Sequence, residues 1–175
     1  LAWAWLLLRH AFASLGFDEA QLTACRRTAS GKPVLPDGAP NFSLSHSDGW
    51  VACAVSGTQP VGLDIQACRR IPARFYAPYL TPGDLAATPD EPKALCRLWA
   101  RKEAVLKWLG TGWTAEAKRS LSVLASTKTL NGVAVAICDQ WVAPDVCAAL
   151  CAPADAQPDI HSISPKEARD FYRID

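Results

Sequence analysis

An uninterrupted amphipathic segment, residues 93–109, is the feature that most constrains how this chain can fold. The segment holds no Gly or Pro, although the chain has 13 Pro and 10 Gly in 175 residues. Gly110 and Gly112 follow it and are typical helix stops. The spacing therefore predicts a long helix whose apolar stripe packs on the rest of the chain, a stripe made of Leu95, Leu98, Trp99, Leu106 and Leu109.

Shorter patterns before this helix predict a second helix and three strands. Apolar residues at helical spacing predict a helix from Trp3 to Leu15, before Gly16. The runs 42–46 and 50–56 predict a pair of strands around a polar turn, and the apolar run 61–66 predicts a third.

Weaker patterns fill the remainder of the chain. The Pro-rich stretch 72–92 predicts a helix around 75–80, and the runs 121–124 and 133–137 around Asn131-Gly132 predict a hairpin. The chain beyond them reads as loops. The order of helix, strands, helix, strands predicts an α+β fold and lacks the regular alternation of a Rossmann sheet.

Composition excludes several broad classes. Half of the residues are apolar, enough for one sizeable core or two small lobes, and the net charge of +1 gives no global field toward nucleic acid or a membrane. The apolar opening, residues 1–8, is too short for a bilayer span of ~20 residues. Seven Cys are an odd count without a metal-site pattern, so we expect thiols in a reducing cytoplasm.

Two carboxylates stand out chemically. Asp64 lies inside a run that otherwise favours burial, where an acid is unfavourable unless it binds a proton, a cation or a partner. Glu103 and Lys107 share a face of the long helix; alone, they are most simply a surface ion pair. Two carboxylates from neighbouring elements would suit Mg²⁺, which takes further ligands from substrate phosphates.

Cationic and polar side chains earlier in the chain could contact those phosphates. Lys32 stands in Gly31-Lys32-Pro33, a stiff loop suited to a point-charge contact. His46 ends a predicted strand beside Ser45, where it is either an exposed turn histidine or a phosphate donor.

Together, these motifs resemble the 4′-phosphopantetheinyl transferase superfamily, and more narrowly its Sfp-type members, which carry two lobes in one chain. The resemblance spans about residues 3–137 and rests on four ordered motifs, Gly31-Lys32-Pro33, Phe42-Ser43-Leu44-Ser45-His46-Ser47, Val61-Gly62-Leu63-Asp64-Ile65, and Trp99-Ala100-Arg101-Lys102-Glu103-Ala104 with Lys107 and Gly110. It implies two pseudo-twofold-related α+β lobes, here 1–58 and 59–175, with coenzyme A and a divalent metal in the cleft between them.

The resemblance also implies an activity and a set of site residues. Family members transfer the 4′-phosphopantetheine arm of coenzyme A to a serine of an acyl or peptidyl carrier protein, releasing adenosine 3′,5′-bisphosphate. By the same resemblance, the metal (Mg²⁺, or Mn²⁺) is held by Asp64, Glu103 and Gln66. Glu103 is also the proposed base. The expected catalytic residues are Glu103, Lys107, Asp64 and His46, and the expected coenzyme A contacts are Lys32, Pro33, Ser45, His46 and Lys107.

Two departures from the family pattern carry their own expectations. Gln66 stands where many members have a third acid, which predicts weaker metal binding without loss of activity. Sfp-type chains have several tens of residues before the helix that matches 3–15, so this sequence either lacks its natural start or is a compact form.

The expected partner is a carrier protein, and no nucleic acid or membrane partner is expected. The residues after the metal strand that could contact an acidic carrier are basic and aromatic, but they equally fit a solvated turn with a small local core. They are Arg69, Arg70, Arg74, Phe75, Tyr76 and Tyr79. A monomer is expected, since tandem lobes form the cleft alone.

Two rival functions stay open. The first is a family member that only binds coenzyme A or a carrier, which Gln66 and the short front favour. The second is another Mg²⁺-dependent enzyme such as a nucleotide hydrolase, disfavoured because the chain has no Walker-type loop. A scaffold role ranks lower still.

Overall fold

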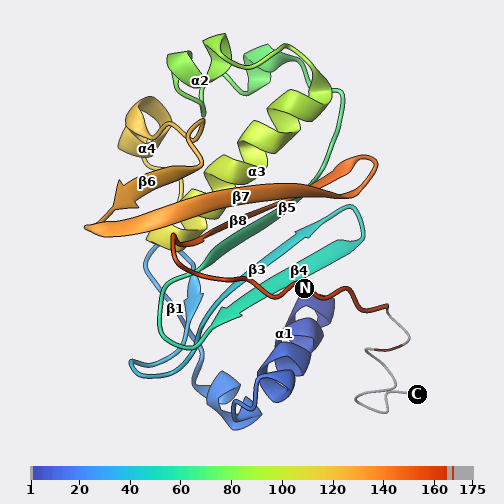
Figure 1. Ribbon diagram of the computed structural model, residues 1–175, viewed down its shortest axis with the longest axis vertical. Coiled ribbons are helices and arrows are strands. Elements are labelled where there is room, and N and C mark those ends of the chain that lie inside the picture. The colour runs from blue at the N-terminus through green and yellow to red at the C-terminus, as the bar shows by residue number, and fades with distance from the viewer. Residues whose placement is uncertain (1, 165–166, 168–175) are drawn as a thin grey trace.

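The computed structural model describes residues 2–164 and 167, and it is an α+β protein (Figure 1). Its helices are α1 (Ala2–Ser14), α2 (Pro82–Ala86), α3 (Pro92–Leu109) and α4 (Ala115–Ser120), with 3₁₀ turns η1 (Glu19–Ala24) and η2 (Ala73–Phe75). Its strands are β1 (Arg26–Arg27), β2 (Pro33–Val34), β3 (Asn41–Ser47), β4 (Trp50–Ser56), β5 (Gly62–Ala67), β6 (Thr127–Leu130), β7 (Val133–Ala143) and β8 (Val146–Pro153). The predicted fold class is confirmed.

The strands form three antiparallel groups. β1 pairs with β2, β3 pairs with β4, and a four-stranded sheet has the order β5-β8-β7-β6. In Figure 1, α3 lies on one side of the strands and α1 on the other, beside β3 and β4. No helix in the described part of the chain has the length and apolar character needed to span a bilayer.

Helix α3 is the centre of the larger core, as its sequence predicts. Pro92 stands in its first turn, and Gly110 ends it with a left-handed φ of 70°, which L side chains rarely adopt. Ala100, Ala104 and Val105 on the helix are fully buried. These small residues let the helix approach β5, β7 and β8.

Gly62 sets the distance between α3 and β5. A Cβ atom at this position would lie 2.0 Å from the carbonyl oxygen of Ala104 and 2.4 Å from the amide nitrogen of Trp108. Only a residue without a side chain lets the helix backbone come this close. This contact brings the two elements that carry Asp64 and Glu103 together.

Alternate serines of β3 join the β3–β4 hairpin to β5. The hydroxyl oxygens of Ser43, Ser45 and Ser47 accept hydrogen bonds from the backbone N–H groups of Leu63, Ile65 and Ala67, at 2.9, 3.1 and 3.0 Å. Each bond joins a serine to the residue 20 positions later in the chain. The spacing is regular because alternate side chains point to the same side of a strand. Small hydroxyl side chains therefore satisfy an edge of β5 that backbone pairing leaves open.

Several sequence predictions for the chain after β5 are wrong. The helix expected at 75–80 is instead the 3₁₀ turn η2 followed by turns, because Pro78 interrupts it. Residues 121–124 form no strand, and β6 begins at Thr127 in their place. The expected loops after 138 include β8, which lies inside the four-stranded sheet.

The expectation that the cysteines are thiols is wrong for one pair. Cys68 and Cys96 form a disulfide that closes a separation of 28 residues and links the end of β5 to α3. Their Cα atoms lie 5.4 Å apart, within the range that a disulfide can bridge. The free cysteines are Cys25, Cys53, Cys138, Cys147 and Cys151.

Candidate active site

Asp64 is a buried carboxylate on β5 that is only half satisfied. Its Oδ1 atom accepts hydrogen bonds from the Ser45 hydroxyl and the Lys107 ammonium, both at 2.7 Å. Its Oδ2 atom is buried and has no hydrogen-bond partner. Burial raises the pKa of Asp64, and Lys107 opposes that rise. The free oxygen therefore favours a bound proton or cation.

Glu103 is the second carboxylate, and it lies on α3 within electrostatic range of the first. Its Oε1 atom accepts a hydrogen bond of 2.9 Å from the indole N–H of Trp113. Burial raises the pKa of Glu103, the Trp113 bond lowers it, and the nearby Asp64 carboxylate raises it further. A carboxyl group with a raised pKa is suited to accepting a proton near neutral pH.

Lysines from two elements meet at the end of α3. Lys107 forms the ion pair with Asp64, and its side chain remains 27% exposed. Lys32 donates a hydrogen bond of 2.6 Å from Nζ to the backbone carbonyl of Lys107, one of the carbonyls that a helix end leaves unpaired. Burial lowers the pKa of Lys32. The structure thus brings Lys32, Lys107 and Asp64 together.

Ser45 and His46 lie on opposite sides of β3. Ser45 is 5% exposed, and its hydroxyl holds both Asp64 and the amide of Ile65. His46 is exposed, and none of the described contacts joins its ring to the two carboxylates. The structure therefore places Ser45 within the acid cluster and leaves His46 at its surface.

Gln66 follows Asp64 by two residues on β5. Its side-chain amide donates a hydrogen bond of 2.9 Å to the carbonyl of Ala67. This leaves the amide oxygen as the atom that could reach a cation.

A surface hollow of about 130 Å³ lies away from the carboxylates. Residues 32–42 line it, which include the expected coenzyme A contacts Lys32 and Pro33. The hollow therefore adjoins the cationic part of the site, and neither Asp64 nor Glu103 lines it.

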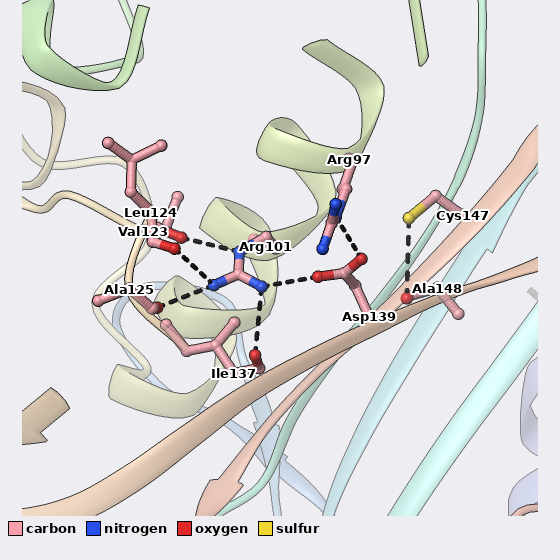
Figure 2. Close-up of polar contacts among 9 residues, drawn as sticks. All are labelled: Arg97, Arg101, Val123, Leu124, Ala125, Ile137, Asp139, Cys147 and Ala148. Carbon is pink, nitrogen blue, oxygen red and sulfur yellow. Dashed lines mark hydrogen bonds and ion pairs between the residues drawn. The ribbon is translucent and has the colours of Figure 1, made fainter. Parts of the chain in front are cut away.

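The sequence did not reveal the contacts of two residues, one on α3 and one that packs against it. Trp113 contacts Glu103 from ten positions downstream, and no local spacing signals such a contact. Arg101 is the other: it is 5% exposed and donates hydrogen bonds to Asp139 and to the carbonyls of Val123, Leu124, Ala125 and Ile137 (Figure 2). Arg101 fixes the segment after α4 onto α3 and β7.

The donor set suits an oxygen-preferring divalent cation. In the described part of the chain no group of three His, Cys, Asp or Glu side chains converges as a metal site. Two carboxylates do lie close together, and one of them has an unpartnered buried oxygen. Mg²⁺ commonly takes one or two carboxylates, and substrate phosphates and water complete its shell, so the residues present fit such an ion.

The chain belongs to the 4′-phosphopantetheinyl transferase superfamily, whose model matches residues 60–151. The matched region contains β5 and α3, and with them Asp64, Gln66, Glu103 and Lys107. The predicted superfamily is thereby confirmed.

Curated relatives carry the same name. The chain is 32% identical over 92 residues to the 4′-phosphopantetheinyl transferase gsp of Aneurinibacillus migulanus, covering 50% of this chain and 38% of the relative. It is 36% identical over 94 residues to HetI of Nostoc sp., also a 4′-phosphopantetheinyl transferase, covering 47% and 39%. A putative 4′-phosphopantetheinyl transferase of Haemophilus influenzae is 31% identical over 117 residues, covering 62% and 50%. The matches thus span half or less of these relatives' length.

Proposed function

We propose that this protein transfers the 4′-phosphopantetheine arm of coenzyme A to a serine of an apo acyl or peptidyl carrier protein. The other product is adenosine 3′,5′-bisphosphate. The observation that carries the proposal is the pair of carboxylates, buried Asp64 and half-buried Glu103, beside Lys107. One of these acids keeps an unpartnered oxygen.

Glu103 and Lys107 have different roles in the proposed reaction. The carrier serine oxygen forms a bond to the phosphorus that bears the pantetheine arm. The bond from that phosphorus to the bridging oxygen of the pyrophosphate breaks. Glu103, whose pKa is raised by burial, takes the serine proton. Lys107 places positive charge beside the leaving bisphosphate.

A divalent cation would be held by Asp64 and Glu103, with the Gln66 amide oxygen as a third donor. Mg²⁺ fits this set, and Mn²⁺ accepts the same oxygen ligands. When bound, the ion neutralises charge on the pyrophosphate. Ser45 orients Asp64 for this task through its 2.7 Å hydrogen bond.

The remaining coenzyme A contacts are proposed for Lys32, Pro33, Ser45 and His46. Lys32 and Pro33 border the hollow of residues 32–42, and Lys32 is one hydrogen bond away from the backbone of Lys107. His46 is exposed, so its ring is accessible to a phosphate. In this proposal, segment 1–58 forms a first lobe and 59–175 a second, with the ligand between them.

The carrier protein would dock beside η2. Phe75 is 57% exposed, and the Arg74 guanidinium lies 5.0 Å from its ring centroid. Arg69 is already paired with Asp48, so the cationic surface offered to an acidic carrier comes from Arg70 and Arg74. We further propose that the protein acts as a cytoplasmic monomer.

A second candidate is binding of coenzyme A or of a carrier protein without transfer. The glutamine at position 66 favours it, because a neutral amide there weakens the metal site. Both candidates predict binding of coenzyme A or a carrier protein, and only the first predicts a product.

The test is the intact mass of an apo carrier protein after incubation with the full-length protein, coenzyme A and Mg²⁺. We expect a gain of one phosphopantetheine, no gain without Mg²⁺, and a strongly reduced gain at equal time with Glu103→Gln. Coenzyme A binding without any gain on fatty-acid, polyketide and peptide carriers would support the second candidate. Release of nucleotide product without a carrier would instead indicate a hydrolase.

A further inference from the structure

Trp113 reaches Glu103 through a sharp reversal of the chain after α3. Gly110 and Gly112 take left-handed φ angles of 70° and 63°, which fold the segment back along the helix. The indole N–H of Trp113 then donates to Oε1 of Glu103 at 2.9 Å. The contact thus depends on the turn and not on helical spacing.

The indole of Trp113 is itself held from two sides. Its ring stacks on that of Trp99, with centroids 4.9 Å apart and planes 27° apart. Tyr79 meets Trp113 edge-on at 5.3 Å and Trp99 edge-on at 5.6 Å. Such aromatic contacts have preferred geometries, so the three rings fix the direction of the N–H bond.

The same packing limits where the Glu103 carboxylate can lie. Trp99 precedes Glu103 by four residues and therefore shares its face of α3. A glutamate side chain has several rotatable bonds, and burial alone does not choose among its rotamers. A hydrogen bond from a fixed donor does choose, because only one position of Oε1 satisfies it.

We propose that Trp113 is a positioning residue that holds Oε1 of Glu103 and thereby fixes where the other carboxylate oxygen, Oε2, lies. This inference rests on the proposed transferase function and adds a residue to it. Trp113 touches neither substrate in this scheme and acts only through Glu103. Its loss therefore changes turnover more than it changes binding.

The contact is tested without any activity, by NMR of the protein labelled with ¹⁵N at tryptophan. Trp113→Phe keeps an aromatic ring for the stack but removes the N–H, so it identifies the Trp113 indole signal. We expect Glu103→Gln to shift that signal while those of the other tryptophans stay. Trp141→Phe is the matched control, because Trp141 is an exposed residue of β7. An unmoved Trp113 signal would overturn the proposal.

The consequence is tested by steady-state kinetics. A hydrogen bond to a charged group contributes enough that its loss predicts a fall in kcat of about 10-fold. For Trp113→Phe we expect that fall with the KM for coenzyme A within about twofold, and for Trp141→Phe no change. Adding Trp113→Phe to Glu103→Gln should lower turnover no further.

The possible failures are distinguishable. A kcat for Trp113→Phe equal to wild type, or an equal loss in both Glu103 backgrounds, would overturn the positioning role. A wild-type protein that modifies no carrier would overturn the proposed function, and the shift of the indole signal would still decide whether Trp113 holds Glu103.

Discussion

Helix α3 carries two ionic clusters, and they differ in how completely their hydrogen bonds are made. Around Arg101, both oxygens of Asp139 are paired, with Arg101 at 2.6 Å and with Arg97 at 2.5 Å, and four backbone carbonyls take the other guanidinium donors (Figure 2). Around Glu103, burial raises the pKa of both acids, and Asp64 keeps an unpartnered oxygen.

The difference separates a structural cluster from a binding one. A buried polar network with every partner present holds its elements together. A buried polar group without a partner destabilises the folded protein, because it has lost its hydrogen bonds to water and gained none in return. A ligand can supply the missing partner. Arg101 and Glu103 are two residues apart on α3, so in the proposed function one helix serves both roles on different faces.

Removing Arg101 should have the largest effect on stability. Arg101→Ala leaves one oxygen of Asp139 and several carbonyls buried without a donor, and breaking such a pair costs about 3–5 kcal/mol. Urea unfolding measures this loss. Arg97→Ala is the control, because the Arg97 side chain is 55% exposed, and we expect less than about 1 kcal/mol. Equal losses would mean that the Arg101 cluster is not the structural one.

Glu103→Gln should separate activity from stability. In the proposed function Glu103 is the general base, and losing such a group lowers turnover about 10²–10⁴-fold. Because the folded-state pKa of Glu103 is raised above 4.5, its contribution to stability is present at low pH and is lost as the pH rises through the raised value. The variant should therefore be at least as stable as wild type at pH 7.

Thermal unfolding from pH 4 to 8 checks the stability half of that prediction. The midpoint temperature of wild type should fall relative to that of Glu103→Gln as the pH rises. A variant that is less stable than wild type at pH 7 would place Glu103 among the structural residues.

Reducing the Cys68–Cys96 disulfide should loosen the link between β5 and α3. A cross-link spanning 28 residues is expected to contribute about 3.5 kcal/mol through the unfolded chain. Urea unfolding of Cys68→Ser with and without reductant tests this, because only wild type should respond. A wild type insensitive to reductant would show that the two thiols are not bonded in solution.

Gly62→Ala should push α3 off β5. Overpacking typically costs about 1–3 kcal/mol, and here the added Cβ would meet helix backbone that cannot rotate away. We expect both stability and transfer activity to fall. Gly83→Ala in α2 is the matched control, since its Cβ would meet nothing closer than 4.0 Å. Similar behaviour of the two variants would contradict the close helix contact.

Lys102 should give the stability of the protein a slope with pH. Its side chain is fully buried and bonds the carbonyl of Leu121, and burial lowers its pKa to about 8. The folded protein then releases a proton that the unfolded chain keeps up to about 10.4. Stability should rise between about pH 8 and 10, and Lys102→Met should remove that rise. A flat wild-type profile would contradict it.

The sequence predicts α1, the strands β3, β4 and β5, and the helix α3. The β3–β4 pair and α3 follow from alternation and from an unbroken apolar stripe. Strand β8 is not predicted, because its residues include several Ala, which has weak β propensity. The strand lies inside the sheet, and its sequence is apolar throughout and does not alternate between apolar and polar residues. Residues 121–124 look like a strand, but their carbonyls bond Lys102 and Arg101 and not a neighbouring strand.

The candidate site follows the same division. Asp64, Glu103 and Lys107 are predictable because a lone acid in an apolar run and a pair at helical spacing are local signals. Trp113 and the serine contacts of β3 are not predictable, since they depend on how separate elements meet. Lys32 is predicted as a phosphate contact, but sequence alone does not reveal its bond to the end of α3.

Ligand-induced stabilisation tests most directly whether the cluster at Asp64 is the binding one. Thermal unfolding of wild type and of Asp64→Asn is measured with coenzyme A and Mg²⁺, alone and together. Ligand at about 100 times its Kd stabilises a protein by about 2.7 kcal/mol. We predict a rise in midpoint of wild type with both ligands that is much smaller in Asp64→Asn. An equal rise in the two proteins would contradict the assignment of this cluster as the binding site.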